Sequence, residues 1–233
     1  MSEPLPVVLV PGLLCSARLY AAQIPRLWTC GPVTVADHTR DDSMGAIARR
    51  ILAAAPPRFA LVGLSMGGYL SFEILRQAPE RVAQLALLDT TARPDVPEAI
   101  AARRAQIALA VSGRLAEVAD AQFMRLVHPA RRGDADLREL NRLMSQEVGA
   151  EGFARQQTAI VGRVDSRPML KDIRCPTLVL VGEADELTPP DRAAEIANGI
   201  AGARLVTVPD CGHLSPIERP EAVTHALLEW LHT

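Results

Sequence analysis

Residues 59–68 read FALVGLSMGG, a short apolar run that ends at Ser65 and is followed by two glycines. The run Phe59–Leu64 predicts a buried strand, because turn-forming residues bound it on both sides. A helical pattern begins directly after Ser65 and continues to Ala78. Residues 63–67 match G-x-S-x-G, and at a junction of strand and helix this pattern is typical of a nucleophilic serine on a tight turn.

Similar short apolar runs alternate with helical patterns on both sides of this stretch, which favours βαβ units and a mainly parallel sheet. The chain therefore predicts an α/β fold with about six strands and helices on both faces. The other strands are expected at Val7–Val10, Val33–Ala36, Val82–Leu88, Thr177–Val181 and Leu205–Val208, with helices from Ser43 to about Ala55 and from about Pro220 to Leu231.

The strand signals stop after Asp89 and resume at Thr177. Between them the apolar residues recur with a period near 3.6, which indicates helices alone. We therefore expect an α/β core made of residues 1–91 and 169–233, with residues 92–168 inserted as a helical cap.

A serine hydroxyl becomes a nucleophile when a base removes its proton and a third group orients that base. His213, in the loop after the last predicted strand, is the candidate base. Asp185, in the loop after the preceding strand, is the candidate acid, and Asp89 is its alternative. Like Ser65, these three residues follow the ends of predicted strands, where a doubly wound sheet places its ligand site. The other histidines are expected to be structural or solvent-facing: His38, His128, His225 and His232.

Acyl transfer also needs hydrogen-bond donors for the oxyanion. The backbone N–H of Met66, the residue after the serine, is the first candidate. The second donor is expected from the loop after the first strand, with Leu13 as first choice and Leu14 as the alternative. Cys15 lies in the same loop and is expected to line the pocket wall.

Composition excludes several other classes. The 233 residues carry 25 Lys and Arg against 27 Asp and Glu, so no basic excess exists for binding nucleic acid. The four cysteines form no CxxC pair, and the five histidines form no HxH or HExxH, so no metal site is expected. The start of the chain lacks a signal-peptide pattern and no apolar run could span a membrane, so a cytoplasmic protein is expected.

Four segments carry a family resemblance: VLVPGLL, LVGLSMGGYLSFEIL, LVLVGEADELTPP and VPDCGHLSPIERPEAV. With them the chain resembles the α/β-hydrolase fold superfamily over nearly its whole length. Within it, GLSMGG and HLSPIERPEA are most similar to 3-oxoadipate enol-lactonase and related small serine carboxylesterases. The resemblance implies hydrolysis without a cofactor beneath a helical cap, with Ser65 as nucleophile, Asp185 as acid and His213 as base.

Two features depart from the family pattern. Pro11-Gly12 stands where the family usually has His-Gly, which alters how the oxyanion loop is anchored. Only six residues precede the first expected strand, so the usual antiparallel strands at the start of the sheet are not expected.

The leading hypothesis is a serine hydrolase that cleaves a small ester, thioester or lactone through an acyl-enzyme. A C–C bond hydrolase or a perhydrolase would use the same triad, and a non-catalytic ligand-sensing protein could also be built on this fold. The expected partner is a small-molecule substrate, and the oligomeric state is not predicted. Candidate pocket residues are Leu14, Phe123, Met124, Met144 and Phe153.

Overall fold

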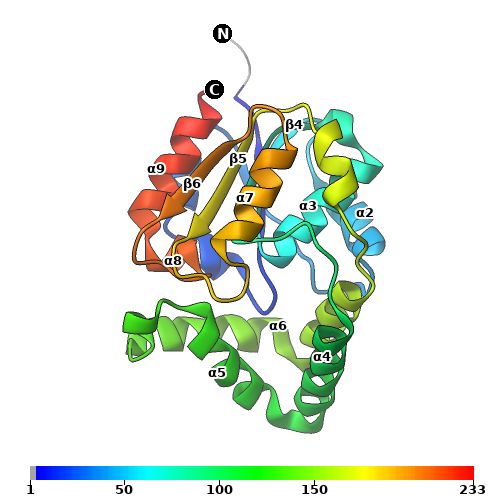
Figure 1. The fold of residues 1–233 in the computed structure, drawn as a ribbon, viewed down its shortest axis with the longest axis vertical. Coiled ribbons are helices and arrows are strands. Elements are labelled where there is room, and N and C mark those ends of the chain that lie inside the picture. Colours follow the sequence, from blue (N-terminus) through cyan, green and yellow to red (C-terminus); the bar gives the residue numbers. More distant parts are fainter. Residues whose placement is uncertain (1–3) are drawn as a thin grey trace.

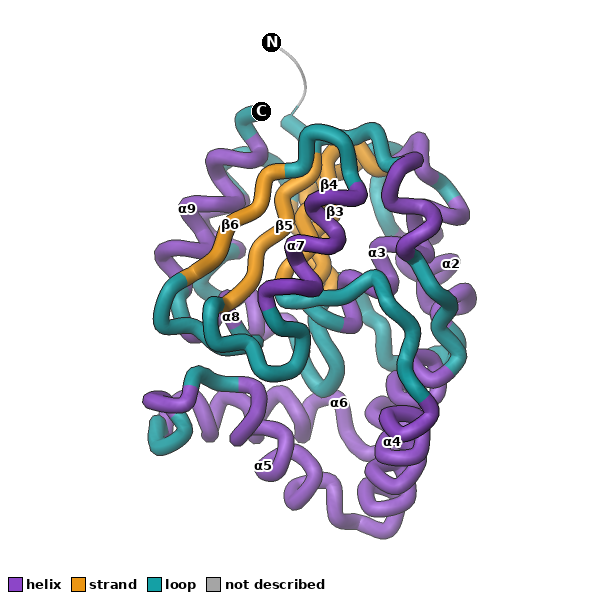
Figure 2. The backbone as a smooth tube through the Cα atoms, in the orientation of Figure 1, coloured by secondary structure: helices purple, strands orange, loops and turns teal. Residues whose placement is uncertain are grey.

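A single parallel sheet forms the centre of the computed structural model, which describes residues 4–233. Its strand order is β2-β1-β3-β4-β5-β6, and every neighbouring pair is parallel (Figures 1 and 2). The predicted six-stranded α/β fold is confirmed, with one-residue differences at three strand ends. The strands are β1 (Val7–Val10), β2 (Val33–Val35), β3 (Phe59–Leu64), β4 (Val82–Leu88), β5 (Thr177–Gly182) and β6 (Arg204–Val208).

Successive residues of the central strands face opposite sides of the sheet, as the two-residue period of a strand requires. In β3, for example, Leu61 belongs to one buried apolar cluster, whereas Ala60 and Val62 belong to the other. Because both faces are covered, the central strands are almost entirely apolar rather than alternating with polar residues, and Gln84 of β4 and Thr177 of β5 are buried exceptions.

Helices cover the two faces of the sheet. Helices α2 (Met44–Ala54), α3 (Met66–Gln77) and α7 (Pro190–Gly199) supply residues to the first cluster. Helices α1 (Ile24–Leu27) and α9 (Pro220–Leu231) supply residues to the second. The periodicity analysis does not predict α1 or α7. Short 3₁₀ segments and one further helix complete the core: η1 (Ala17–Tyr20), η2 (Pro79–Arg81), η5 (Arg167–Asp172) and α8 (Ser215–Glu218).

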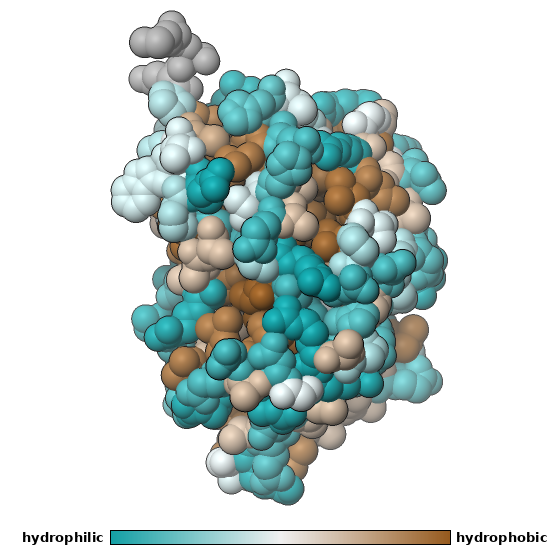
Figure 3. Space-filling model, turned by 90° about the vertical axis from the view of Figure 1, so that its left-hand side faces the viewer, coloured by the Kyte–Doolittle hydropathy of each residue, from teal (hydrophilic) through white to brown (hydrophobic). Residues whose placement is uncertain are grey.

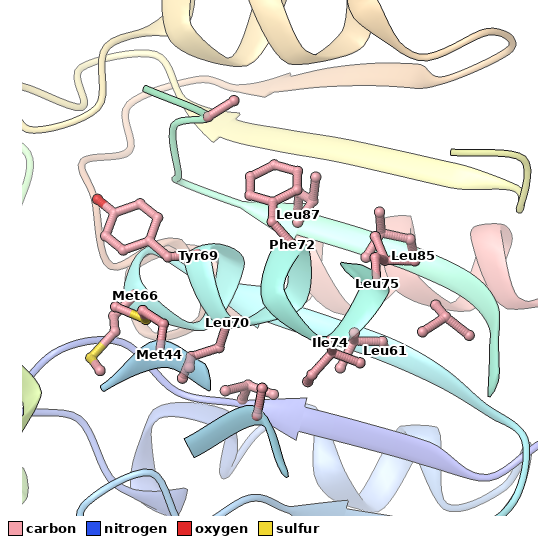
Figure 4. Close-up of a cluster of buried hydrophobic side chains, with 14 of the residues drawn as sticks. Met44, Leu61, Met66, Tyr69, Leu70, Phe72, Ile74, Leu75, Leu85 and Leu87 are labelled. Carbon is pink, nitrogen blue, oxygen red and sulfur yellow. The ribbon is translucent and has the colours of Figure 1, made fainter. Parts of the chain in front are cut away.

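Helix α3 lies at the centre of the first cluster. Figure 4 shows its side chains, among them Leu70 and Phe72, pointing toward residues of β3, β4 and α2. Ser43 begins α2, because its hydroxyl accepts a hydrogen bond from the N–H of Ala46 at 3.3 Å. Packing against the sheet and against α2 therefore holds the helix that starts directly after Ser65.

Between β4 and β5 the described chain is helical, and Figure 1 shows these helices in green beyond the ends toward which the strands run. Gly149 interrupts the longest of them with φ +70°. The cap boundaries at 92 and 168 stay a prediction. The cap elements are α4 (Pro97–Leu109), η3 (Ala110–Arg114), α5 (Leu115–Leu126), η4 (Pro129–Arg131) and α6 (Ala135–Val161).

On the face drawn in Figure 3, hydrophobic residues occur as separate patches among hydrophilic ones. Among residues 4–233, no helix is both long enough and apolar enough to cross a bilayer.

The two tryptophans of the chain provide a matched test of how α9 holds the fold. Trp230 is 3% exposed, packs in the second cluster and donates its indole N–H to the carbonyl of Pro176 at 3.2 Å. We expect Trp230→Ala to lower the free energy of unfolding by about 3–5 kcal/mol, because it leaves a cavity and removes the hydrogen bond from the indole to the Pro176 carbonyl. Urea unfolding followed by circular dichroism measures the loss.

Trp28→Ala is the control, since Trp28 is 69% exposed. Its free energy of unfolding should stay within about 0.5 kcal/mol of the parent value. Equal losses in the two variants would contradict the docking of α9 described above.

Candidate active site

Ser65 occupies a strained turn between β3 and α3. Its φ of +54° and ψ of −111° lie where a residue with a side chain is rarely found. The backbone holds this conformation, because the Ser65 N–H donates to the carbonyl of Leu88 at 2.9 Å and the hydroxyl of Thr90 donates to the Ser65 carbonyl at 2.8 Å. The side chain lies at the end of the sheet where the strands β3 and β4 terminate.

The glycines flanking Ser65 allow this turn to form. A Cβ atom at Gly67 would lie 2.1 Å from the carbonyl oxygen of Val10, and one at Gly63 would lie 2.3 Å from the carbonyl oxygen of Gly67. Helix α3 therefore begins in direct contact with the end of β1. Met66 is the first residue of that helix, so its N–H has no partner within the helix and is free to serve an anion.

His213 and Asp185 form a buried pair at the same edge of the sheet. Nδ1 of His213 lies 2.7 Å from Oδ2 of Asp185, and both side chains are almost fully buried. The Asp185 carboxylate also accepts hydrogen bonds from the hydroxyl and N–H of Thr188 and from the N–H of Leu187. These bonds fix the carboxylate in the loop after β5, and it in turn fixes the imidazole.

The pKa values of the pair shift in opposite directions. Burial disfavours the imidazolium, but the Asp185 charge and hydrogen bond outweigh it and raise the pKa of His213. Burial likewise disfavours the carboxylate, but His213 and the hydrogen bonds from Thr188 outweigh it and lower the pKa of Asp185. The pair is thus arranged to stabilise an imidazolium facing a carboxylate.

Asp89, the alternative acid, lies close by in a different set of contacts. Its carboxylate accepts the N–H of Gly182 at 2.8 Å and the hydroxyl of Ser215 at 2.5 Å. Burial, reinforced by the Asp185 charge, raises the pKa of Asp89. Among the described residues it is Asp185, and not Asp89, that is hydrogen-bonded to the His213 ring.

A third buried acid, Glu218, holds the loop that carries His213. One carboxylate oxygen accepts the N–H groups of Gly212 and Leu214, which flank the histidine, at 3.1 and 3.2 Å. The other oxygen accepts the N–H of His128 in the cap at 2.7 Å. Glu218 therefore joins the histidine loop to the cap.

The cap also contacts the histidine loop through its backbone. The N–H of His213 donates to the carbonyl of Leu126, the last residue of α5, at 2.7 Å. The N–H of Leu214 donates to the same carbonyl at 3.3 Å. The placement of His213 thus depends on cap and core together.

The loop after β1 brings the remaining predicted residues to the site. Leu14 has a φ of +56°, and its N–H donates to the side-chain oxygen of Gln156 at 3.1 Å. Within residues 4–233 the N–H of Leu13 has no acceptor. Burial raises the pKa of Cys15 to about 12, so its thiol stays protonated.

The candidate pocket residues divide into three groups. Leu14 and Phe153 are buried in one apolar cluster, in which the cap helices pack against Leu14. Phe123 and Met144 are buried in the cluster that continues into the second face of the sheet. Met124 is 41% exposed, and its sulfur lies 3.7 Å from a guanidinium nitrogen of Arg138. Their role as substrate-lining residues stays a prediction.

Four residues of the site were missed by the sequence analysis. Glu218 lies in the quoted segment VPDCGHLSPIERPEAV, and its spacing of five residues after His213 was the available signal. Thr188 lies three residues after Asp185, directly beyond the N–H of Leu187 that the Asp185 side chain accepts two residues on, as in an Asx-turn. His38 and Gln156 contact the site only through the tertiary fold, so no local pattern marks them.

Within residues 4–233, no group of three or more His, Cys, Asp or Glu side chains is placed to hold a metal ion.

Comparison with known proteins identifies the family. A model described as the Alpha/beta hydrolase family matches residues 7–226. A Mycobacterium tuberculosis protein that carries the name non-heme bromoperoxidase BpoC is 30% identical over 184 residues, which cover 77% of this chain and 69% of that protein.

Solved structures agree with this assignment. A thermophilic esterase from Thermogutta terrifontis superposes with a TM-score of 0.90 at 33% identity, covering 99% of this chain and 90% of that one. An enol-lactonase from Burkholderia xenovorans LB400 superposes with a TM-score of 0.87 at 25% identity, covering 100% and 93%. The resemblance to enol-lactonases and small esterases is confirmed. The chain has a parallel sheet and a serine on the turn after β3, and the family model matches nearly its full length. The chain therefore belongs to the alpha/beta hydrolase family.

Proposed function

We propose that this protein is a serine hydrolase that cleaves a small carboxylic ester, thioester or lactone. The observation that carries the proposal is the buried hydrogen bond between His213 and Asp185, at the same edge of the sheet as Ser65 on its strained turn. Similar proteins named as an esterase and an enol-lactonase support ester bonds over carbon–carbon bonds as the target.

In the first half of the reaction, His213 removes the hydroxyl proton of Ser65 while the oxygen attacks the substrate carbonyl. The carbonyl π electrons move to its oxygen, and the N–H groups of Met66 and Leu13 donate to this oxyanion. When the tetrahedral intermediate collapses, the bond to the leaving alcohol, or to the ring oxygen of a lactone, breaks. The imidazolium, stabilised by Asp185, returns its proton to that oxygen.

In the second half, His213 removes a proton from water, which attacks the acyl-enzyme carbonyl. Collapse releases the carboxylic acid and returns the proton to Ser65. Every step uses the same imidazole as base and then as acid, so the orientation of the His213 ring by Asp185 serves both halves.

The apolar cluster formed by the cap helices and Leu14 supports a substrate with a small apolar portion. Leu14 and Phe153 are fully or almost fully buried there, with Val118 and Ala119 of α5 beside them. Leu13, which carries a proposed oxyanion donor, packs against the same cluster. An acyl or ring carbon skeleton bound at this cluster would lie close to the donors.

The nucleophile is tested by Ser65→Ala. We expect hydrolysis of short p-nitrophenyl esters to fall by at least about 10³-fold, because the attacking oxygen is gone. A fluorophosphonate probe should label the parent protein at Ser65, located by mass spectrometry, and should leave the variant unlabelled.

Ser71→Ala is the matched control, since Ser71 is a buried serine of α3, the helix that follows Ser65, and its hydroxyl donates to the Gly67 carbonyl. It should keep both labelling and turnover. Unchanged turnover in Ser65→Ala would contradict the proposed mechanism.

The acid is tested by comparing Asp185→Asn with Asp89→Asn. Loss of the Asp185 charge removes the group that orients and stabilises the His213 imidazolium, so kcat should fall on the order of 10³- to 10⁴-fold. Asn at position 89 can still accept the Gly182 N–H and bond the Ser215 hydroxyl, so kcat should fall far less. The reverse ranking of the two kcat values would assign the acid to Asp89.

The pH dependence follows from the raised pKa of His213. The ring must be neutral to accept the serine proton, so kcat/KM should rise with pH and level off above a midpoint that exceeds the ordinary histidine value of about 6.5. In Asp185→Asn the midpoint of the residual kcat/KM should lie at lower pH, because the charge that stabilises the His213 imidazolium is lost. A profile of kcat/KM from about pH 5 to about pH 9 shows both midpoints. A midpoint that does not move in Asp185→Asn would assign the titration to another group.

A further inference from the structure

The oxyanion loop is held by a side chain of the cap. The side-chain oxygen of Gln156, on α6, accepts the N–H of Leu14 at 3.1 Å, and Gln156 is fully buried. The two residues are 142 positions apart in the sequence. This bond therefore exists only when the cap is folded onto the core.

The bond acts on a backbone that needs an external restraint. Leu14 has a φ of +56°, a left-handed conformation that a leucine rarely adopts and that persists where its surroundings enforce it. The peptide unit between Leu13 and Leu14 is held at both ends, because the thiol of Cys15 lies 3.4 Å from the Leu13 carbonyl oxygen and Gln156 holds the Leu14 N–H.

The preceding peptide unit is held as well. The carbonyl oxygen of Gly12 accepts the N–H of Cys15 at 3.1 Å and lies 2.9 Å from Nε2 of His38. That carbonyl and the Leu13 N–H belong to one trans peptide unit and point in opposite directions. Fixing the oxygen on one side therefore aims the Leu13 N–H on the other.

His38 and Gln156 also contact each other. Nε2 of His38 lies 3.0 Å from the amide nitrogen of Gln156. This ring nitrogen donates to Gly12 when it carries a proton and accepts from the Gln156 amide when it does not. Burial lowers the pKa of His38, which favours the neutral ring. The imidazole beside this loop thus comes from His38, after β2, whereas position 11 is a proline.

We propose that Gln156 is a positioning residue: by holding the Leu14 N–H from the cap, it directs the Leu13 N–H, and not that of Leu14, toward the oxyanion. The inference rests on the proposed hydrolase function. It assigns to the cap a part in stabilising the transition state, separate from any contact with substrate.

Kinetics of Gln156→Leu test this role. We expect kcat for short p-nitrophenyl esters to fall between about 10-fold and 100-fold with KM changed less than about threefold, because the misplaced donor acts on the oxyanion and not on bound substrate. The Ser65 oxygen adds to the carbonyl of a short-chain trifluoromethyl ketone while its proton passes to His213, which leaves an alkoxide in the oxyanion position. The affinity for this inhibitor should therefore fall by the same factor. Gln156→Glu keeps an acceptor oxygen and should recover most of the loss.

Gln157→Leu is the matched control. Gln157 is the next residue of α6 and is equally buried, but its amide bonds Arg103 and Gln106 within the cap. This variant should lose thermal stability while keeping kcat and inhibitor affinity within about twofold of the parent values. Equal losses of kcat in the two variants would show that Gln156 only stabilises the cap, and would overturn the proposal.

Amide hydrogen exchange tests the hydrogen bond between Leu14 and Gln156 directly, without any substrate. In ¹⁵N-labelled protein, the Leu14 amide should exchange with solvent at least about tenfold more slowly in the parent than in Gln156→Leu. Equal exchange would overturn the proposal even if activity fell. Should Gln156→Leu not fold, Gln156→Met keeps the chain length and takes its place.

If the protein were not a serine hydrolase, a different set of results would be observed. A parent protein that neither hydrolyses esters nor reacts with the fluorophosphonate would refute the hydrolase function. The exchange rate of Leu14 would still show whether Gln156 holds the loop.

Discussion

The start of α3 lies so close to the ends of β1 and β3 that no side chain fits at positions 63 and 67. This contact sets the position of everything else at the site. It forces Ser65 into its strained conformation, leaves the Met66 N–H at an open helix end, and places the loop after β1 beside the serine. The buried apolar cluster around α3 fixes the position of the helix, and the Ser65 backbone therefore stays in its strained conformation.

The cap is joined to the site at two separate loops. Through Gln156 it reaches the loop of the proposed oxyanion donor, and through Leu126 and His128 it reaches the loop of His213. Each joint uses buried hydrogen bonds, whose loss leaves unpaired polar groups in a dry environment. The geometry of the candidate site is therefore a property of cap and core folded together.

The fold and the serine could be predicted from the sequence because their signals are local. A strand's apolar run, a turn's glycines and a helix's period all lie within a few residues of each other. The six strands and the turn at Ser65 follow from such patterns. The placement of His213 and Asp185 follows one step further, from the rule that parallel strands end at one edge.

The contacts that hold the site could not be predicted in the same way. Asp89 and Asp185 both follow strands, and only the folded chain shows which carboxylate reaches the imidazole. His38 was expected to be structural or solvent-facing, and it is buried against the oxyanion loop. Gln156 reads as one more polar residue of a helix, since a partner 142 positions away leaves no local pattern.

The joint between the cap and the histidine loop is made to backbone atoms of the cap. Glu218 binds the N–H of residue 128, and His213 and Leu214 bind the carbonyl of residue 126, whatever side chains those positions carry. These hydrogen bonds use none of the side chains of residues 126–128, although Val127 is itself buried in the second cluster, and they depend on how many residues lie there. A substitution at position 126 or 128 leaves the bonding backbone atoms in place, whereas an insertion or deletion at this point would move the histidine itself.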